Sequence, residues 1–208
     1  MLYYLDLLGT LAFAISGAYL AKKEKLYILA VILLGLITAV GGGTVRDLIL
    51  GRMPLFYLKD PNYLLVSFAG GILTYLMPTF FKKAYSFFRL MDSVGLAAFL
   101  IIGVSVSFNR LFIPSASLSA ISFLVCVFFG MLTGFGGSVI RESIIGRVPL
   151  SLKKKSNYAL SAFAGASSFY LLMFLNIQLA TAVSILITLA LREFFSPYGI
   201  YRKVLKGI

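Results

Sequence analysis

The sequence predicts an all-α membrane protein in which seven transmembrane helices form two inverted three-helix repeats followed by a seventh helix. Of the 208 residues, 60% are hydrophobic and only 12% are charged. A soluble domain carries about 25% charged residues, so this chain has about half as many. Long stretches without a charged residue and an internal duplication are the other two observations behind this prediction.

The duplication is visible in a motif that occurs twice, with corresponding positions 95 residues apart. Gly-x-x-Thr-x-x-Gly-Gly begins at Gly35 and again at Gly130, and an arginine followed by an acid comes after each copy. Earlier matches, such as Asp6 with Asp92, are 86 residues apart. Since each copy holds three predicted spans, an odd number, the second copy must enter the membrane from the opposite side. We therefore divide the chain into repeats at 1–84 and 85–175, with residues 176–208 as a seventh span and a basic tail.

The first repeat supplies three apolar stretches of about the 20 residues that a transmembrane helix needs. We predict spans over residues 3–21, 26–50 and 62–81. The first carries only Asp6 near its start, and the second is free of charge as far as Arg46. A lysine-rich turn separates these two spans, and a loop that ends at Asp60-Pro61 precedes the third.

The second repeat and the seventh span follow the same pattern. We predict spans over residues 91–108, 115–146 and 157–175, and a last one over 177–195. Residues 156–191 lack any charge for 36 positions, and one helix of that length would reach about 54 Å. A hydrocarbon core is roughly 30 Å thick, so the polar Asn176 and Gln178 are interpreted as a turn between two spans.

Basic residues are distributed unevenly between the two sides of the predicted membrane. One side has Arg52, Lys59 and Arg110, while Arg46 and Arg141 lie within spans. Basic loops stay cytoplasmic, so we predict an external amino terminus and a cytoplasmic carboxyl terminus. The cytoplasmic side then holds fourteen basic residues: Lys22, Lys23, Lys25, Lys82, Lys83, Arg89, Arg147, Lys153, Lys154, Lys155, Arg192, Arg202, Lys203 and Lys206.

The charge and the reactive residues exclude several classes of function. The net charge of +12 is explained by the loop asymmetry and by anionic lipid headgroups, so we expect no nucleic-acid partner. Cys126 is the single cysteine, and histidine is absent. The usual zinc sites and the Ser-His type of catalysis are therefore not expected. We predict no enzymatic activity, no cofactor and no metal site.

Glycine clusters in the second and fifth predicted spans are the main candidates for a functional site. Each glycine costs about 1 kcal/mol relative to alanine in a helix. The clusters either allow close helix crossing, or unwind or kink the helix and turn carbonyl groups toward a water-filled cavity. Their presence near the midplane of both inverted copies favours the second, functional interpretation. The candidate residues are Thr38, Gly41, Gly42, Gly43, Thr133, Gly134, Gly136, Gly137 and Ser138.

An arginine within each glycine-bearing span is the second candidate feature. Arginine costs at least about 2.5–3.5 kcal/mol near the centre of a bilayer. Arg46 and Arg141 either form structural ion pairs or stand in a permeation path and control it. The possible partners are the adjacent Asp47 and Glu142, or an acid of the first or fourth span. Both interpretations remain open from the sequence.

Two aspartates near the start of the first and fourth spans complete the set of candidates. An acid near a helix amino terminus is stabilised by the helix dipole, which is the simpler interpretation of Asp6 and Asp92. Attraction of a cation is the alternative. An intramembrane aspartic protease would need the two carboxylates together, whereas the inverted arrangement places them toward opposite membrane faces.

The chain resembles the trimeric intracellular cation (TRIC) channel family in its prokaryotic branch. Similar sequences are also labelled as a glycine transporter or uncharacterised membrane domain. The resemblance covers nearly the whole chain and is carried by four strings. These are Gly41-Gly42-Gly43-x-x-Arg46-Asp47, Gly51-Arg52-x-Pro54, Pro61-x-Tyr63, and Gly134-x-Gly136-Gly137-x-x-x-Arg141-Glu142.

The resemblance implies a symmetric homotrimer with one pore per subunit, lined by the kinked, glycine-bearing second and fifth helices. It implies kinks at residues 41–43 and 134–137, with Arg46 and Arg141 as basic pore residues. Ser138 replaces the third glycine of the second string. We therefore expect a potassium-permeable monovalent-cation channel in the plasma membrane. The alternative is a secondary transporter of a small amino acid such as glycine.

Overall fold

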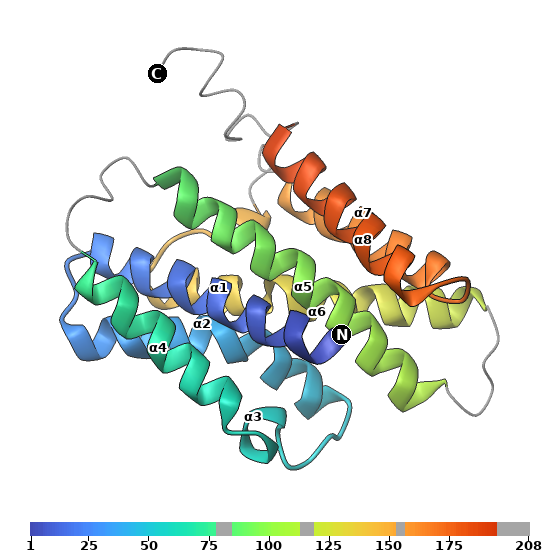
Figure 1. The fold of residues 1–208 in the computed structure, drawn as a ribbon, viewed down its shortest axis with the longest axis horizontal. Helices are drawn as coiled ribbons and strands as arrows, with labels where there is room; N and C mark the ends of the chain where they lie inside the picture. The colour runs from blue at the N-terminus through green and yellow to red at the C-terminus, as the bar shows by residue number, and fades with distance from the viewer. Residues whose placement is uncertain (78–84, 113–118, 153–156, 195–208) are drawn as a thin grey trace.

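The computed structural model describes residues 1–77, 85–112, 119–152 and 157–194, and its regular elements in these ranges are helices (Figure 1). The predicted basic residues Lys82, Lys83, Lys153, Lys154, Lys155, Arg202, Lys203 and Lys206 lie outside the described residues. The elements are α1 (Leu2–Lys23), α2 (Ile28–Ile49), α3 (Phe56–Lys59), α4 (Asn62–Leu76), α5 (Tyr85–Leu111), α6 (Ala120–Ile144), η3 (Leu150–Leu152), α7 (Tyr158–Leu172), α8 (Ile177–Leu189) and η4 (Ala190–Phe194).

Each of the seven predicted spans corresponds to one helix. Helices α1, α2, α5 and α6 are long and apolar enough to cross a membrane, whereas α4 and α7 are shorter apolar helices of 15 residues each. Asn176 begins α8 by accepting hydrogen bonds from the backbone N–H groups of Gln178 and Leu179. The polar pair therefore marks the turn that the sequence predicts. The short helix α3 lies within the loop before α4, where the sequence analysis expects no helix.

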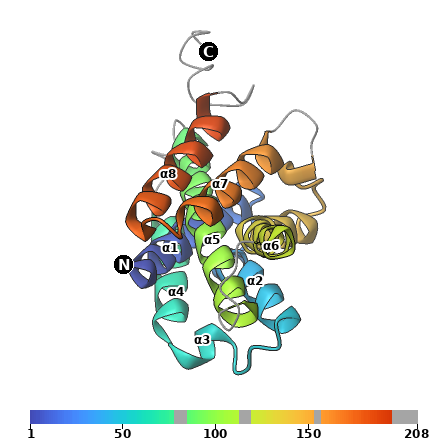
Figure 2. The ribbon, with the colours of Figure 1, turned by 90° about the vertical axis from the view of Figure 1, so that its right-hand side faces the viewer.

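Two triplets of helices pack in the same way, as an inverted repeat requires. Helices α1, α2 and α4 contact one another, and so do α5, α6 and α7. The triplets meet along α1 with α5 and along α2 with α6, while α8 lies on α7 and α5. Figure 2 shows α6 nearly end-on, with α5 beside it, α2 below it and α7 above it. The two glycine-bearing helices thus lie side by side where the triplets meet.

The repeat extends to individual contacts between helices. A Cβ atom placed on Gly17 would lie 2.3 Å from Thr38 Oγ1, and one placed on Gly103 would lie 2.6 Å from Thr133 Oγ1. The corresponding residues Phe13 and Phe99 meet each other with ring centroids 5.1 Å apart, edge to face. A residue that meets its own counterpart lies close to the axis that relates the repeats. Each repeat therefore reproduces the other's local packing.

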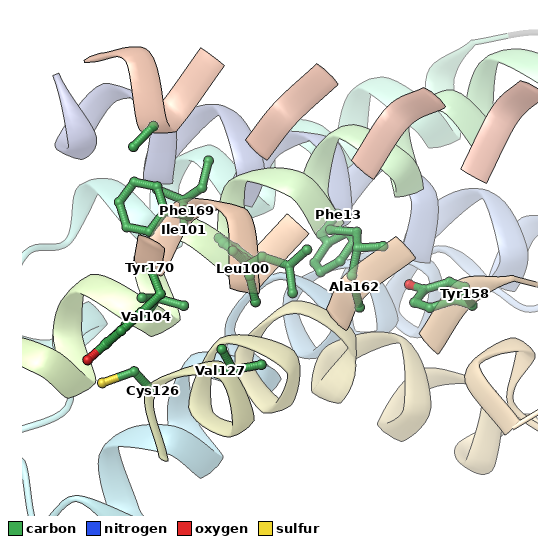
Figure 3. Packing of buried hydrophobic residues seen from close by; sticks show 14 of the residues in the cluster. Phe13, Leu100, Ile101, Val104, Cys126, Val127, Tyr158, Ala162, Phe169 and Tyr170 are labelled. Carbon is green, nitrogen blue, oxygen red and sulfur yellow. The ribbon is translucent and has the colours of Figure 1, made fainter. Parts of the chain in front are cut away.

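The buried core spans both triplets. Figure 3 shows side chains from α1, α5, α6 and α7 pointing into one cluster, among them Phe13, Leu100, Val127 and Phe169. Large apolar side chains such as Leu124 and Leu186 remain exposed on the outside of the bundle. In a membrane these outer side chains contact lipid tails, so their exposure carries no hydrophobic penalty.

Contacts between loops sort the described basic residues onto two ends of the bundle. At one end, Arg147 forms an ion pair with Glu24, and Lys22 Nζ donates to the carbonyl oxygens of Tyr75 and Met77 at 2.6 Å each. The stacked rings of Tyr19 and Phe88, whose centroids are 3.7 Å apart, place the start of α5 at this end too. Tyr3 marks the other end, where its hydroxyl donates to Asp60 Oδ2 at 2.7 Å. Lys22, Lys23, Lys25, Arg89, Arg147 and Arg192 lie toward the first end, and Arg52, Lys59 and Arg110 toward the second.

Candidate functional site

Helices α2 and α6 cross with their backbones in direct contact. A Cβ atom on Gly137 would lie 2.1 Å from the carbonyl oxygen of Thr38, and one on Gly42 would lie 2.2 Å from the carbonyl oxygen of Thr133. A Cβ on Gly136 would lie 3.0 Å from Gly42 Cα. No side chain therefore fits between the two helices at this point, and glycine is required on both.

The loss of helical structure predicted at the glycines is wrong. Helix α2 runs without a break from Ile28 to Ile49, and α6 from Ala120 to Ile144. The hydroxyl groups of Thr38 and Thr133 donate back to carbonyl oxygens within their own helices, at 2.6 and 2.7 Å. Because close crossing compensates for the low helix propensity of glycine, the helices keep their regular hydrogen bonds. The glycines therefore allow close crossing and do not unwind either helix, while a kink within a continuous helix stays a prediction.

The remaining candidate positions of the glycine clusters face different neighbours. A Cβ on Gly43 would meet the Phe56 ring at 2.7 Å, and one on Gly134 would meet Leu100 Cδ2 at 2.8 Å. A Cβ on Gly41 would lie 3.1 Å from the end of the Ile140 side chain and at an ordinary contact distance of 3.6 Å from Gly137 Cα.

Ser138 stands where the first repeat has Gly43, and its side chain is committed to hydrogen bonds. The hydroxyl donates to the Phe135 carbonyl oxygen at 2.8 Å and lies 3.1 Å from the Tyr158 hydroxyl. The second repeat therefore places a polar side chain at a position where the first repeat has none.

Both in-span arginines are buried and pair with the acid that follows them in the sequence. Arg46 Nε lies 2.8 Å from Asp47 Oδ1, and Arg141 Nη2 lies 3.0 Å from Glu142 Oε1. Arg52 also reaches Asp47 Oδ1, at 3.0 Å. Arg46 and Arg141 are each only 3% exposed. The adjacent acid is thus the ion-pair partner of each arginine, as the sequence analysis proposed among its alternatives.

Asp92 carries the most elaborate polar network of the described chain. Its carboxylate accepts hydrogen bonds from Arg141 Nη1 at 2.9 Å and from Ser16 Oγ at 3.1 Å. Arg192 of η4 forms a second ion pair with it, and Tyr158 donates to Oδ2 at 3.3 Å. The two guanidinium groups therefore compensate the charge of the buried Asp92 carboxylate.

The interpretation of Asp6 and Asp92 as acids stabilised by the dipole at a helix amino terminus finds no support in the structure, because this effect falls off within the first turn. Helix α1 begins at Leu2 and α5 at Tyr85, and neither has an acid in its first turn. Asp6 instead accepts a hydrogen bond from Tyr63 of α4, at 2.8 Å. Both aspartates therefore serve contacts between helices.

A small cavity lies between the two repeats, next to Asp6. The volume within which the centre of a water molecule can lie is about 10 Å³, so the cavity holds about one water. The lining residues come from five helices: Asp6, Ala39, Gly43, Arg46, Phe56, Phe99 and Thr133. The site therefore combines a carboxylate, a guanidinium and a hydroxyl-bearing residue around a space the size of a small ion.

Sequence reasoning missed several residues of this site. Tyr63 and Tyr158 occupy matching positions in the two repeats, so their shared pairing with Asp6 and Asp92 could have been read from the duplication. The duplication does not point to Phe56 or Arg192. Phe56 belongs to the short helix α3, and Arg192 belongs to η4, which follows α8 and lies outside the two repeats.

Comparisons with known proteins agree with this arrangement. A family model described as "Glycine transporter" matches residues 3–79 and 89–174. The UPF0126 inner membrane protein YadS of Escherichia coli (strain K12) is 34% identical over 196 residues, covering 92% of this chain and 90% of that protein. A UPF0126 membrane protein of Deinococcus radiodurans is 38% identical over 176 residues, covering 82% and 76%.

Solved structures are similar over most of the chain. The TRIC trimeric intracellular cation channel orthologue from Rhodobacter sphaeroides has a TM-score of 0.82 and 26% identity, covering 100% of this chain and 98% of that one. A structure described as "Structural basis for conductance through TRIC cation channels" has a TM-score of 0.77 and 33% identity, covering 91% and 89%.

The crossing of α2 and α6 predicts that Gly137→Ala lowers stability. The added methyl group would overlap the Thr38 carbonyl and force the helices apart, and overpacking of this kind costs about 1–3 kcal/mol. Circular dichroism in detergent should show a lower apparent melting temperature. Gly41→Ala is the matched control, because the one tight contact of its methyl group is with a flexible side-chain end, and the nearest backbone atom is 3.6 Å away. Equal melting temperatures for the two variants would contradict the proposed crossing.

The two aspartates should respond differently to removal of their charge. Asp92→Asn leaves two buried guanidinium groups without their shared anion, and breaking a buried pair costs about 3–5 kcal/mol. Asp6→Asn keeps an acceptor for Tyr63 and breaks no ion pair among the described residues. We therefore expect Asp92→Asn to lower the melting temperature well below that of Asp6→Asn. A larger loss for Asp6→Asn would show that the ion pairs around Asp92 do not stabilise the fold.

Proposed function

The chain belongs to the family described as "Glycine transporter" and is similar along its length to prokaryotic TRIC channels, and we propose that it is a monovalent-cation channel. The observation that carries this proposal is the polar interior between the inverted repeats. Each repeat buries an arginine paired with an acid, and Arg46 of the first repeat lines a cavity together with Asp6. Ionisable groups inside a membrane are costly and mark ion pathways in many proteins.

We assign the ion path to the interface between α2 and α6. Inverted repeats place their sites near the midplane, and these two helices bring Gly42 and Gly137 together there. Their backbone contact leaves no room for an ion at the crossing itself. The arrangement therefore corresponds to a closed path, and conduction requires α2 and α6 to move apart.

Arg46 and Arg141 are proposed to control this path. At an effective dielectric constant of about 20, two like unit charges about 6 Å apart repel by roughly 3 kcal/mol. An arginine that leaves its carboxylate partner would therefore exclude a cation from a narrow passage. While Arg46 is paired with Asp47, its charge is compensated, so the ion pair couples side-chain position to ion entry.

Finer properties of the channel follow from the resemblance to TRIC channels. We propose potassium as the main permeant ion, a homotrimer with one pore per subunit, and a location in the plasma membrane. The basic end of the bundle, which includes Lys22 and Arg147, is proposed to face the cytoplasm. The amino terminus then lies outside, together with Arg52 and Lys59.

A transporter of a small amino acid such as glycine is the second candidate. The description of the matching family favours it, and a buried guanidinium such as that of Arg46 is a suitable partner for a substrate carboxylate. This alternative also uses inverted repeats. It differs from the channel in requiring saturable uptake and no unitary current.

Planar-bilayer recording of the purified protein tests the channel proposal. We expect unitary currents in symmetric potassium chloride, and a reversal potential under a potassium/sodium gradient that indicates preference for potassium. Glycine uptake into proteoliposomes is measured in parallel. Saturable uptake without unitary currents would instead establish the transporter.

Substitution of the two arginines tests their proposed control of the path. Arg46→Ala and Arg141→Ala should each change unitary conductance or open probability, because a positive charge is removed beside the ion. Arg46→Lys keeps the charge and should remain closer to the unmodified channel. All variants are first compared by size-exclusion chromatography to establish that they fold. Unchanged single-channel currents in both alanine variants would eliminate the gating role.

A further inference from the structure

The two repeats build the same pair of side chains at equivalent places. Tyr63 donates its hydroxyl proton to Asp6 at 2.8 Å, and Tyr158 donates to Asp92 at 3.3 Å. Each pair joins the first helix of its repeat to the third. A tyrosine that donates its proton keeps its oxygen lone pairs, so each pair presents a carboxylate and a phenolic oxygen together.

In the second repeat, a positively charged side chain already occupies this pair. Arg192 forms an ion pair with Asp92, and its Cζ lies 3.9 Å from the centre of the Tyr158 ring. A guanidinium against a carboxylate and over an aromatic face makes the contacts that a bound cation makes. Arg192 belongs to η4, which follows the seventh helix. The first repeat therefore has no equivalent of this residue.

In the first repeat, Asp6 lines the small cavity that lies between the two repeats. Among the residues that the structure describes, no lysine or arginine nitrogen lies within 4 Å of the Asp6 carboxylate. Gly43 has no side chain where the second repeat has the Ser138 hydroxyl, and the apolar Phe56 ring lies against it instead. Both substituents that fill the second half, a hydroxyl and a guanidinium, are thus missing from the first.

The arginine that lines this cavity forms its direct ion pair with another acid. Arg46 pairs with Asp47, and Arg52 binds the same carboxylate from its partly exposed position. These two arginines therefore act first on Asp47. Asp6 retains one direct hydrogen-bond donor, Tyr63, and faces a space the size of one water molecule.

We propose that Asp6, whose carboxylate is held by Tyr63, binds a monovalent cation that has lost part of its hydration shell, and that Arg192 is a tethered cation at the equivalent place on Asp92. This inference rests on the proposed channel function and locates one ion within it. It also explains the asymmetry of an otherwise duplicated site. The first repeat binds an exchangeable ion at Asp6, whereas the guanidinium of Arg192 is a permanent cation at Asp92 in the second.

Thallium, a scatterer that substitutes for potassium, tests the site in crystals of the whole protein. We expect an anomalous peak beside the Asp6 carboxylate that disappears in Asp6→Asn and persists in Asp60→Asn. Asp60 is the matched control, because it is an acid of the same end of the bundle that does not line the cavity. No peak at Asp6, or a peak that survives Asp6→Asn, would overturn the proposal.

Arg192→Ala tests the second half of the inference. In the folded variant, a second thallium peak should appear between Asp92 and Tyr158. A folded variant with thallium at Asp6 and none at Asp92 would refute the equivalence of the two places. If this variant does not fold, thermal unfolding of the unmodified protein and of Asp6→Asn tests ion binding at Asp6 instead. Potassium chloride should raise the melting temperature above that in choline chloride, and Asp6→Asn should lose this increase.

The inference and the proposed function fail in different ways. Unitary potassium currents without thallium at Asp6 would refute the site and leave the channel intact. Thallium at Asp6 in a protein that carries no current would retain the site and remove the channel function.

Discussion

Two helix backbones that cross without an intervening side chain determine the arrangement of the rest. The carbonyl oxygens of Thr38 and Thr133 lie where any side chain on Gly137 or Gly42 would have to be. This reciprocal contact brings the backbones of α2 and α6 together. Each helix also carries a buried arginine about one turn beyond its glycine, Arg46 on α2 and Arg141 on α6.

Duplication followed by divergence accounts for the polar interior. Both repeats keep an aspartate bonded to a tyrosine, and both keep an arginine bonded to the next acid. The second repeat then acquires a third partner, since η4 delivers Arg192 to Asp92. Ser138 in place of Gly43 adds a hydroxyl on the same side. A symmetric ancestor would have two equal halves, whereas this chain has one stabilised by ion pairs and one with an adjoining cavity.

Much of the fold could be predicted from the sequence, because its strongest signals are compositional. Charge-free stretches identify the helices, and a constant separation between matched residues identifies the repeat. Three of the acids that form ion pairs could also be predicted from the sequence. Asp47 and Glu142 follow their arginines directly, and Asp92 was one of the acids considered for Arg141. The sequence could not distinguish the two roles of the glycines, since close crossing and unwinding require the same residue.

The sequence by itself determined which segments cross the membrane, how the halves are related and on which ends the basic residues gather. These properties depend on hydrophobicity and periodicity along the chain. Only the tertiary structure decided that the glycines seal a helix crossing, that Phe56 lies against Gly43, and that Arg192 reaches Asp92. Such contacts join residues far apart in the chain, and their geometry depends on how the helices pack. A local pattern carries no record of that packing.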